Sequence, residues 1–209
     1  MARVFTADDG SHGNEVLVVV GDGLPAAAVR QEVARTAPAP ATVFVDADRF
    51  DVRIHNPKLE RPFAGHPLLG TVAVLCELGR TPETLSAPAG HVRVWSADGL
   101  CWLHAPAGWS PNARHRQVAT AAEVEALTGP PADEPVQVWA WVDEPAGVVR
   151  ARQFAPSEGK PEDEACGSAS MVLAAALGRP LTVSHGRGSV IHVRPRGAGV
   201  DLGGRCLVG

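Results

Sequence analysis

The sequence predicts an α/β protein made of two similar halves with a cleft between them. Strand-like runs alternate with a few helical segments along the 209 residues. Two apolar segments, "GHPLLGTVAVLCELGR" (65–80) and "EACGSASMVLAAALGR" (164–179), both end in Leu-Gly-Arg and lie 99 residues apart, nearly half the chain. Each is apolar on almost every side, which is typical of a buried helix. The repeat therefore predicts two sheet-wrapped helices, one in each half.

Strand patterns dominate the first half. Runs rich in β-branched and aromatic residues are separated by short polar turns, at 3–7, 15–20 and 41–57. Between the last two runs, Leu24–Arg35 has helical spacing, with one face formed by Val29, Val33 and Ala34. Residues 91–106 predict a hairpin whose tight turn is Asp98-Gly99. The first lobe is expected to span residues 1–105, with its central helix near 66–79.

The second half repeats this organisation. A polar, proline-rich region between Pro106 and Pro135 contains one short predicted helix, near Ala121–Leu127. The remaining strand runs follow at 136–142, 147–156, 181–195 and 199–209. The second lobe is expected to span residues 106–209, with its central helix near 167–178.

Composition excludes several classes of protein. The formal net charge of −4 gives no basic surface for nucleic acid. No apolar run reaches membrane-spanning length, and the N-terminus lacks the apolar core of a signal peptide, so we expect a cytoplasmic protein. The four cysteines lie far apart without metal-ligand spacing, and no phosphate-binding loop or serine-hydrolase motif is present. We expect no metal and no cofactor.

The stretch "EDEACGSAS" (162–170) stands at the start of the second apolar helix. Both central helices should direct their N-termini, with unpaired amide N–H groups and positive dipole ends, toward the cleft. Such ends bind carboxylates, so a small anionic substrate is the expected ligand. Asp163 and His66 could handle protons, or they could simply stabilise helix starts. Cys166 could be a reactive thiol or a packing residue, and Ser168 could bond a ligand or cap the helix.

Several landmarks resemble the PhzF-like family, which is named for phenazine biosynthesis. They are "VFT" near the N-terminus with Gly13-Asn14 after it, "VRIHNP" before "FAGHPLLG", and "ARQFAP" before "EDEACGSAS". The resemblance implies the diaminopimelate-epimerase-like fold, in which each lobe is a rolled, mostly antiparallel sheet around a central helix. It also implies a homodimer without metal or organic cofactor, and isomerisation by proton transfer within a small acid.

The resemblance assigns site residues by position. His66 and Asp163 match the histidine and the acid of the two motifs, and Ser168 matches the hydroxyl. Gly65 and Gly167 match glycines beside the ligand, and Cys166 stands where related epimerases carry a catalytic cysteine. The loop containing His12 and Asn14 corresponds to a region that lines the cleft, whereas Glu162 and Glu164 are expected to be solvated or capping.

One position departs from the family pattern. The Glu that usually precedes the strand "TxFV" and acts as the main acid/base is replaced by Ala41, and the region between Pro106 and Pro135 is shortened. We therefore expect an isomerase that moves a proton and a double bond within a small unsaturated or cyclic amino-acid-like carboxylic acid. It would act in secondary-metabolite or antibiotic biosynthesis. The alternatives are a racemase or epimerase that uses Cys166 and His66, and a non-catalytic protein that binds small acids.

Overall fold

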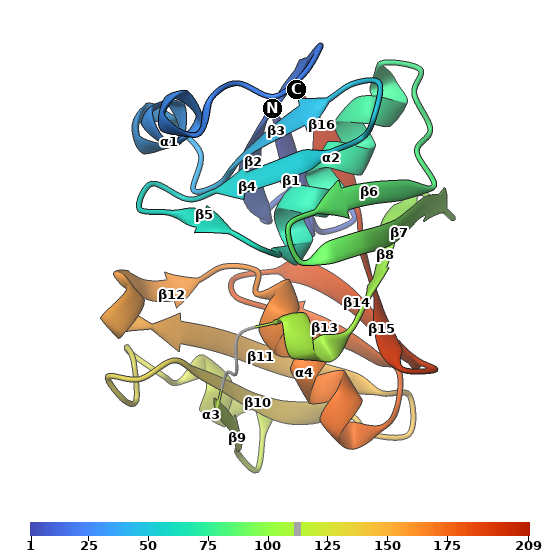
Figure 1. Cartoon of the computed structure of the whole chain (residues 1–209). Helices are drawn as coiled ribbons and strands as arrows, with labels where there is room; N and C mark the ends of the chain where they lie inside the picture. Colours follow the sequence, from blue (N-terminus) through green and yellow to red (C-terminus); the bar gives the residue numbers. More distant parts are fainter. Residues whose placement is uncertain (111–113) are drawn as a thin grey trace.

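The computed structural model describes residues 1–110 and 114–209. Its helices are few and its strands many, as the α/β prediction requires (Figure 1). The helical elements are α1 (Ala27–Thr36), α2 (Gly65–Glu77), α3 (Ala121–Glu125), α4 (Gly167–Leu177) and two 3-10 turns, η1 (Ala107–Trp109) and η2 (Pro156–Glu158). No helix in the described ranges combines the length and the apolar character needed to cross a membrane.

The smaller sheet carries six strands and holds both ends of the chain. Its order is β16 (Cys206–Val208), β1 (Ala2–Val4), β2 (Asn14–Gly21), β3 (Thr42–Asp46), β4 (Val52–His55) and β5 (Glu60–Arg61). Neighbouring strands are antiparallel except for the parallel pair β2 and β3. The N-terminal ammonium donates to the Gly209 carbonyl at 2.8 Å, so the two termini lie side by side (Figure 1).

The larger sheet carries ten strands and continues from the first half of the chain into the second. Its order is β6 (Thr84–Ala87), β7 (Gly90–Ala97), β8 (Leu100–Ala105), β15 (Gly199–Gly204), β14 (Ser189–Arg196), β13 (Leu181–His185), β11 (Val148–Ala155), β10 (Val136–Asp143) and β9 (Arg114–Gln117), with β12 (Lys160–Asp163) paired to β11. Most pairs are antiparallel; β9 with β10 and β11 with β13 are parallel.

The two halves of the chain exchange strands. The last strand, β16, returns to pair with β1, and β8 of the first half pairs with β15 of the second. In Figure 1 the segments around α2 nevertheless occupy the upper part of the molecule and those around α4 the lower part. A boundary between residues 105 and 106 remains a prediction, because both sheets contain strands from both sides of it.

The two central helices form where the repeat predicts them. Helix α2 begins at Gly65 and buries nine of its residues against strands of both sheets, and α4 begins at Gly167 and packs on β14 and β15. Gly178, with a φ of 64°, ends α4 in the left-handed conformation that glycine adopts without steric cost. The apolar content of both segments is thus explained by burial on several sides.

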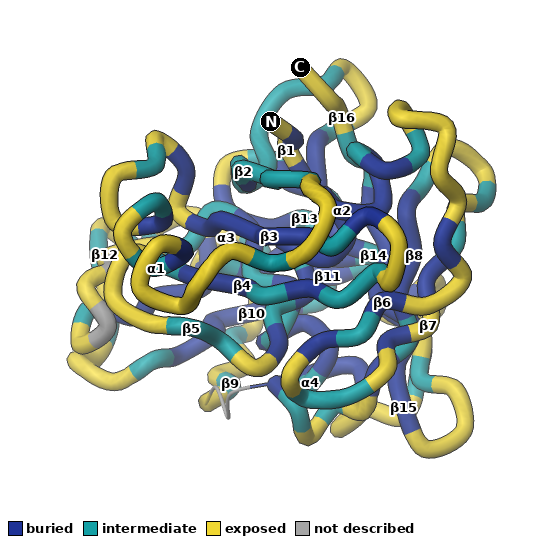
Figure 2. The backbone as a smooth tube through the Cα atoms, turned by 45° about the horizontal axis from the view of Figure 1, so that its top comes forward, coloured by how far each residue is buried: buried dark blue, intermediate teal, exposed yellow. Residues whose placement is uncertain are grey.

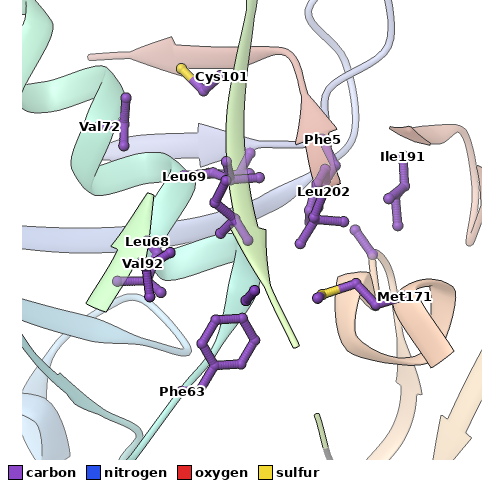
Figure 3. Close-up of a cluster of buried hydrophobic side chains, with 14 of the residues drawn as sticks. Phe5, Phe63, Leu68, Leu69, Val72, Val92, Cys101, Met171, Ile191 and Leu202 are labelled. Carbon is purple, nitrogen blue, oxygen red and sulfur yellow. The ribbon is translucent and has the colours of Figure 1, made fainter. Parts of the chain in front are cut away.

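One apolar core runs between the two helices. Figure 3 shows Leu69 of α2 and Met171 of α4 in the same cluster as Phe5 and Leu202. All four side chains are less than 2% exposed. Figure 2 shows the same pattern along the backbone, with buried central strands and exposed loops at the periphery. The shared core holds the starts of both helices in place relative to each other.

The first helix is shorter than predicted, and it buries only part of the predicted face. It starts at Ala27 rather than Leu24. Ala34 of the predicted face is buried and Val33 partly so, but Val29 is 52% exposed, so its place on the buried face is wrong. Arg30 is buried instead, and its Nε donates to His55 Nε2 on β4 at 3.2 Å. A polar contact with the sheet therefore sets the orientation of this helix, and apolar periodicity cannot detect such a contact.

The predicted hairpin is confirmed, with Asp98 and Gly99 at φ values of 54° and 73° between β7 and β8.

Candidate active site

A cleft of about 390 Å³, called the central cleft below, lies where the starts of α2 and α4 meet. From the first half it is lined by Ala41, Ile54, His55, Arg61, Gly65 and His66 among others. From the second half its walls include Gln153, Asp163, Cys166, Gly167 and Ser168. The structure thus brings six of the predicted site residues to one cleft, although they lie up to about 100 residues apart in the sequence.

Both helix starts lack a side-chain cap. The N-cap residues are Ala64 for α2 and Cys166 for α4, and in the described structure the side chain of neither accepts a capping hydrogen bond from a first-turn amide. The first amide N–H groups of a helix need partners from outside the helix. Because both starts line the central cleft, these groups and the positive ends of the helix dipoles can bind an anion there.

Glycine at these two helix starts allows close packing against the shared core. A Cβ on Gly65 would collide with the Leu202 side chain, and a Cβ on Gly167 would lie 3.0 Å from the ring of Phe5. A side chain at position 65 would therefore force Leu202 to move, and one at position 167 would be tightly packed against Phe5. Gly65 and Gly167 line the central cleft as the sequence predicts, and the core contact gives a second reason for their identity.

Asp163 is held in a defined orientation. Its Oδ1 accepts hydrogen bonds from Asn14 Nδ2 at 2.8 Å and from the Ala165 amide at 3.2 Å. Asn14 Nδ2 also donates to the Ala165 carbonyl at 3.0 Å. Asn14 is not among the described residues that line the central cleft, so the structure places it behind Asp163. This arrangement makes Asn14 a positioning residue for the carboxylate.

His12 lies away from the central cleft. Its Nδ1 is 3.8 Å from Glu164 Oε1, and its ring packs against Gly188 in the turn between β13 and β14. The loop is anchored there because the Gly13 amide donates to Ser189 Oγ at 2.9 Å. The structure therefore does not bring His12 to the described walls of the cleft, in contrast to the prediction that it contacts the ligand.

The two flanking glutamates are structural. Glu162 forms two hydrogen bonds of 2.7 Å with the Arg152 guanidinium, and Glu164 accepts from the Arg187 amide and from Ser189 Oγ. Glu162 is exposed, as predicted, although it also pairs with Arg152. For Glu164 the prediction of a solvated or capping role is wrong, because its side chain is only 14% exposed and bonds the turn between β13 and β14. Their partners come from distant strands, so the local sequence gave no sign of these contacts.

Two residues that line the central cleft were not predicted from the sequence. His55 is 2% exposed; its Nδ1 lies 2.9 Å from Gln31 Oε1, and its Nε2 accepts from Arg30. Because guanidinium can only donate, this pairing requires the neutral Nδ1–H tautomer. Gln153 is 4% exposed and donates through Nε2 to the Phe154 carbonyl. The alternation of small and polar residues in "VRARQFA" was a signal for its inward position, since Ala151, Gln153 and Ala155 share one face of β11.

A second histidine is buried beneath Asp163. His185 is fully buried, and its Nδ1 lies 2.9 Å from the Glu164 carbonyl. Burial lowers the pKa of His185 below 6.5, and the Arg150 charge acts in the same direction. The Asp163 and Glu164 carboxylates and the bond to the carbonyl oppose this shift. His185 is therefore a neutral donor that ties the turn after β13 to the segment carrying Asp163.

This buried histidine predicts acid sensitivity. The native state leaves His185 unprotonated, whereas the unfolded chain binds a proton below its pKa of 6.5. Neutral His185 therefore stabilises the fold fully above pH 6.5. As the pH falls below 6.5, the free energy of unfolding decreases by about 1.4 kcal/mol per pH unit from this residue. Denaturant unfolding at pH 7.5, 6.5 and 5.5 should show a shallower decline for His185→Asn than for the wild type. The exposed residue His91, changed to Asn, is the control; equal slopes in all three proteins would contradict the prediction.

Comparison with known proteins decides the family. Residues 2–139, about two thirds of the sequence, match the family described as phenazine biosynthesis-like protein, PhzC-PhzF. This chain belongs to the PhzC-PhzF family. The resemblance drawn from the sequence motifs is thereby confirmed, and the match includes Ala41, Gly65 and His66.

Similar solved structures confirm the predicted fold class. A putative phenazine biosynthesis PhzC/PhzF protein from Clostridium difficile superposes with a TM-score of 0.79 at 18% identity, covering 100% of this chain and 95% of its own. A predicted epimerase from Pseudomonas aeruginosa has a TM-score of 0.72 at 22% identity, with coverages of 98% and 94%. A hydroxyproline epimerase from Agrobacterium vitis, with bound trans-4-hydroxy-L-proline, has a TM-score of 0.65 at 14% identity, with coverages of 100% and 89%.

Proposed function

We propose that the protein is a cofactor-independent isomerase that moves a proton, and with it a double bond, within a small carboxylic acid. The observation that carries the proposal is the convergence of two uncapped helix starts with His66 and Asp163 in one cleft. His66 is the second residue of α2, and Asp163 is the last residue of β12, so two rigid elements from opposite halves present them to the cleft. Members of the family carry a name from phenazine biosynthesis, which supports a place in secondary metabolism.

The proposed reaction uses two proton transfers. The carboxylate of Asp163 removes an acidified C–H proton, which leaves a conjugated anion delocalised toward the substrate carboxylate. Protonated His66 then donates a proton to the conjugated carbon, and exchange with solvent restores both side chains. The amide groups at the start of α4 and the Ser168 hydroxyl hold the carboxylate, and the two helix dipoles stabilise the developing charge.

Ala41 explains why Asp163 is assigned the first step. Position 41 lines the central cleft and is 6% exposed, so the family's usual Glu would project into the site from there. A methyl group cannot accept a proton. Among the described residues that line the cleft, Asp163 is the one carboxylate, and this supports its assignment as the base.

Solvent deuterium incorporation tests the proposed function. The protein is incubated in deuterated water with a panel of small unsaturated and cyclic amino-acid-like acids, and carbon-bound deuterium is measured by mass spectrometry. An isomerase incorporates deuterium into at least one acid and shifts its double bond. Binding of these acids without any incorporation would instead indicate the non-catalytic alternative.

Replacement of Cys166 distinguishes the proposed isomerase from a racemase or epimerase. The epimerases of similar fold favour the alternative, because Cys166 lines the cleft at the start of α4, where a helix dipole stabilises a thiolate. We expect Cys166→Ala to retain deuterium incorporation within a few-fold of the wild type, because Asp163 and His66 remain. Cys76→Ala, on α2 outside the cleft, controls for general effects of losing a thiol. Near-complete loss in Cys166→Ala alone would favour the epimerase.

We also propose a homodimer. Strand β16 lies at the edge of its sheet, with Leu207 and Val208 each more than 40% exposed, and such an edge invites pairing with a second chain. Light scattering at micromolar concentration should give twice the chain mass. A monomer mass over the whole concentration range would contradict this proposal.

A further inference from the structure

Arg61 places a cation on the cleft-facing side of the smaller sheet. It pairs directly opposite Ile54 between β5 and β4, and Ile54 is opposite Val43 on β3. Residues opposite each other in an antiparallel pair project from the same face. Ile54 and Val43 are buried in the core, so Arg61 continues this inner row at the edge of the sheet. There it is half-buried and lines the central cleft.

Lys58 and Asp163 also line the central cleft, but the charged neighbours of Arg61 on β4, β5 and α1 lie on the opposite face of the sheet. Glu60 precedes Arg61 in the strand and therefore points the other way. Its carboxylate lies 3.4 Å from Arg30 Nη2 and 3.5 Å from Arg53 Nε. In the described parts of the chain, Arg61 forms neither a hydrogen bond nor an ion pair. Because side chains alternate along the strand, the Arg61 guanidinium faces the cleft, whereas the Glu60 carboxylate pairs with Arg30 and Arg53 on the other face.

An unneutralised guanidinium in a partly buried site indicates a ligand with matching charge. Arginine offers a planar fork of donors that fits a carboxylate in a bidentate pair. The uncapped starts of α2 and α4 supply a separate element that binds an anion in the same cleft. Two distinct anion-binding elements fit an acid with two carboxylates better than an acid with one.

We infer that Arg61 is a specificity-determining residue that binds a second carboxylate of the substrate, and that the substrate class is a small dicarboxylic acid. One carboxylate lies at the start of α4, and the other pairs with Arg61 on β5. This inference rests on the proposed function only in using the same cleft. Binding can therefore test it without turnover.

The test compares two acids of the same shape. Glutarate and its monoamide, glutaramate, differ only in the charge at one end, and calorimetry gives the dissociation constant of each. We expect the wild type to bind glutarate about 10- to 100-fold more tightly, the range for a hydrogen-bonded charged group. Arg61→Gln should remove this preference, and Arg61→Lys should restore part of it. Arg53→Gln removes the same charge from the outer face of the adjacent strand and should keep the preference.

The outcomes separate this inference from the proposed function. An equal preference for glutarate in the wild type and in Arg61→Gln overturns the inference, whatever the deuterium experiment shows. Equal weakening of glutarate and glutaramate in Arg61→Gln also overturns it, because Arg61 would then hold the only carboxylate. A lost preference in Arg61→Gln supports the inference even if no acid exchanges deuterium, in which case only the proposed isomerisation falls.

Discussion

Replacement of His66 by Ala is expected to lower kcat/KM by about 10²–10⁴-fold for the acid identified by deuterium exchange. His66 lies in the first turn of α2 and lines the central cleft, while the core face of that helix is carried by Leu68, Leu69 and Val72. Removal of the imidazole therefore takes away the group proposed to return the proton without opening a cavity in the core. The fold and the melting temperature should remain close to those of the wild type.

Two measurements test this prediction. Initial rates of deuterium incorporation give kcat/KM, and circular dichroism confirms that the variant is folded. His91→Ala removes an exposed imidazole elsewhere and should keep full activity. If folded His66→Ala works within a few-fold of the wild type, His66 has no part in proton transfer.

Asp163→Asn is expected to abolish deuterium incorporation while the substrate still binds within a few-fold of the wild type. The Asn side chain is nearly the same size, and its Oδ1 can still accept the hydrogen bonds from Asn14 and the Ala165 amide. The lost feature is the basic carboxylate, because an amide does not accept a proton at neutral pH. The variant thus separates the chemistry of Asp163 from its structural contacts.

The matched control lies one residue away. Glu162→Gln removes a carboxylate that pairs with Arg152 and is not among the described residues lining the cleft, so it should retain deuterium incorporation. Calorimetry with the substrate and mass spectrometry of the product measure binding and exchange independently. Exchange by Asp163→Asn at the wild-type rate would assign the base to another group and leave "EDEACGSAS" as a helix start.

The sequence predicted the fold class and most of the candidate site because both are expressed in local patterns. The repeat of two segments apolar on nearly all sides located α2 and α4 to within one or two residues, since burial on several sides excludes polar residues. The turn at Asp98-Gly99 was predictable because few residues adopt positive φ at both positions. The motifs around His66 and Asp163 marked the helix starts that line the central cleft.

Tertiary structure alone decided the contacts between elements. Three contacts join elements that are distant in sequence: Arg30 of α1 is buried against His55, Asn14 anchors Asp163, and Glu164 accepts from Arg187 and Ser189. Polar contacts of this kind have no period that a sequence can display. The same holds for Arg61, whose cleft-facing position depends on the register of β5 against β4, because a shift of one residue would turn it to the other face.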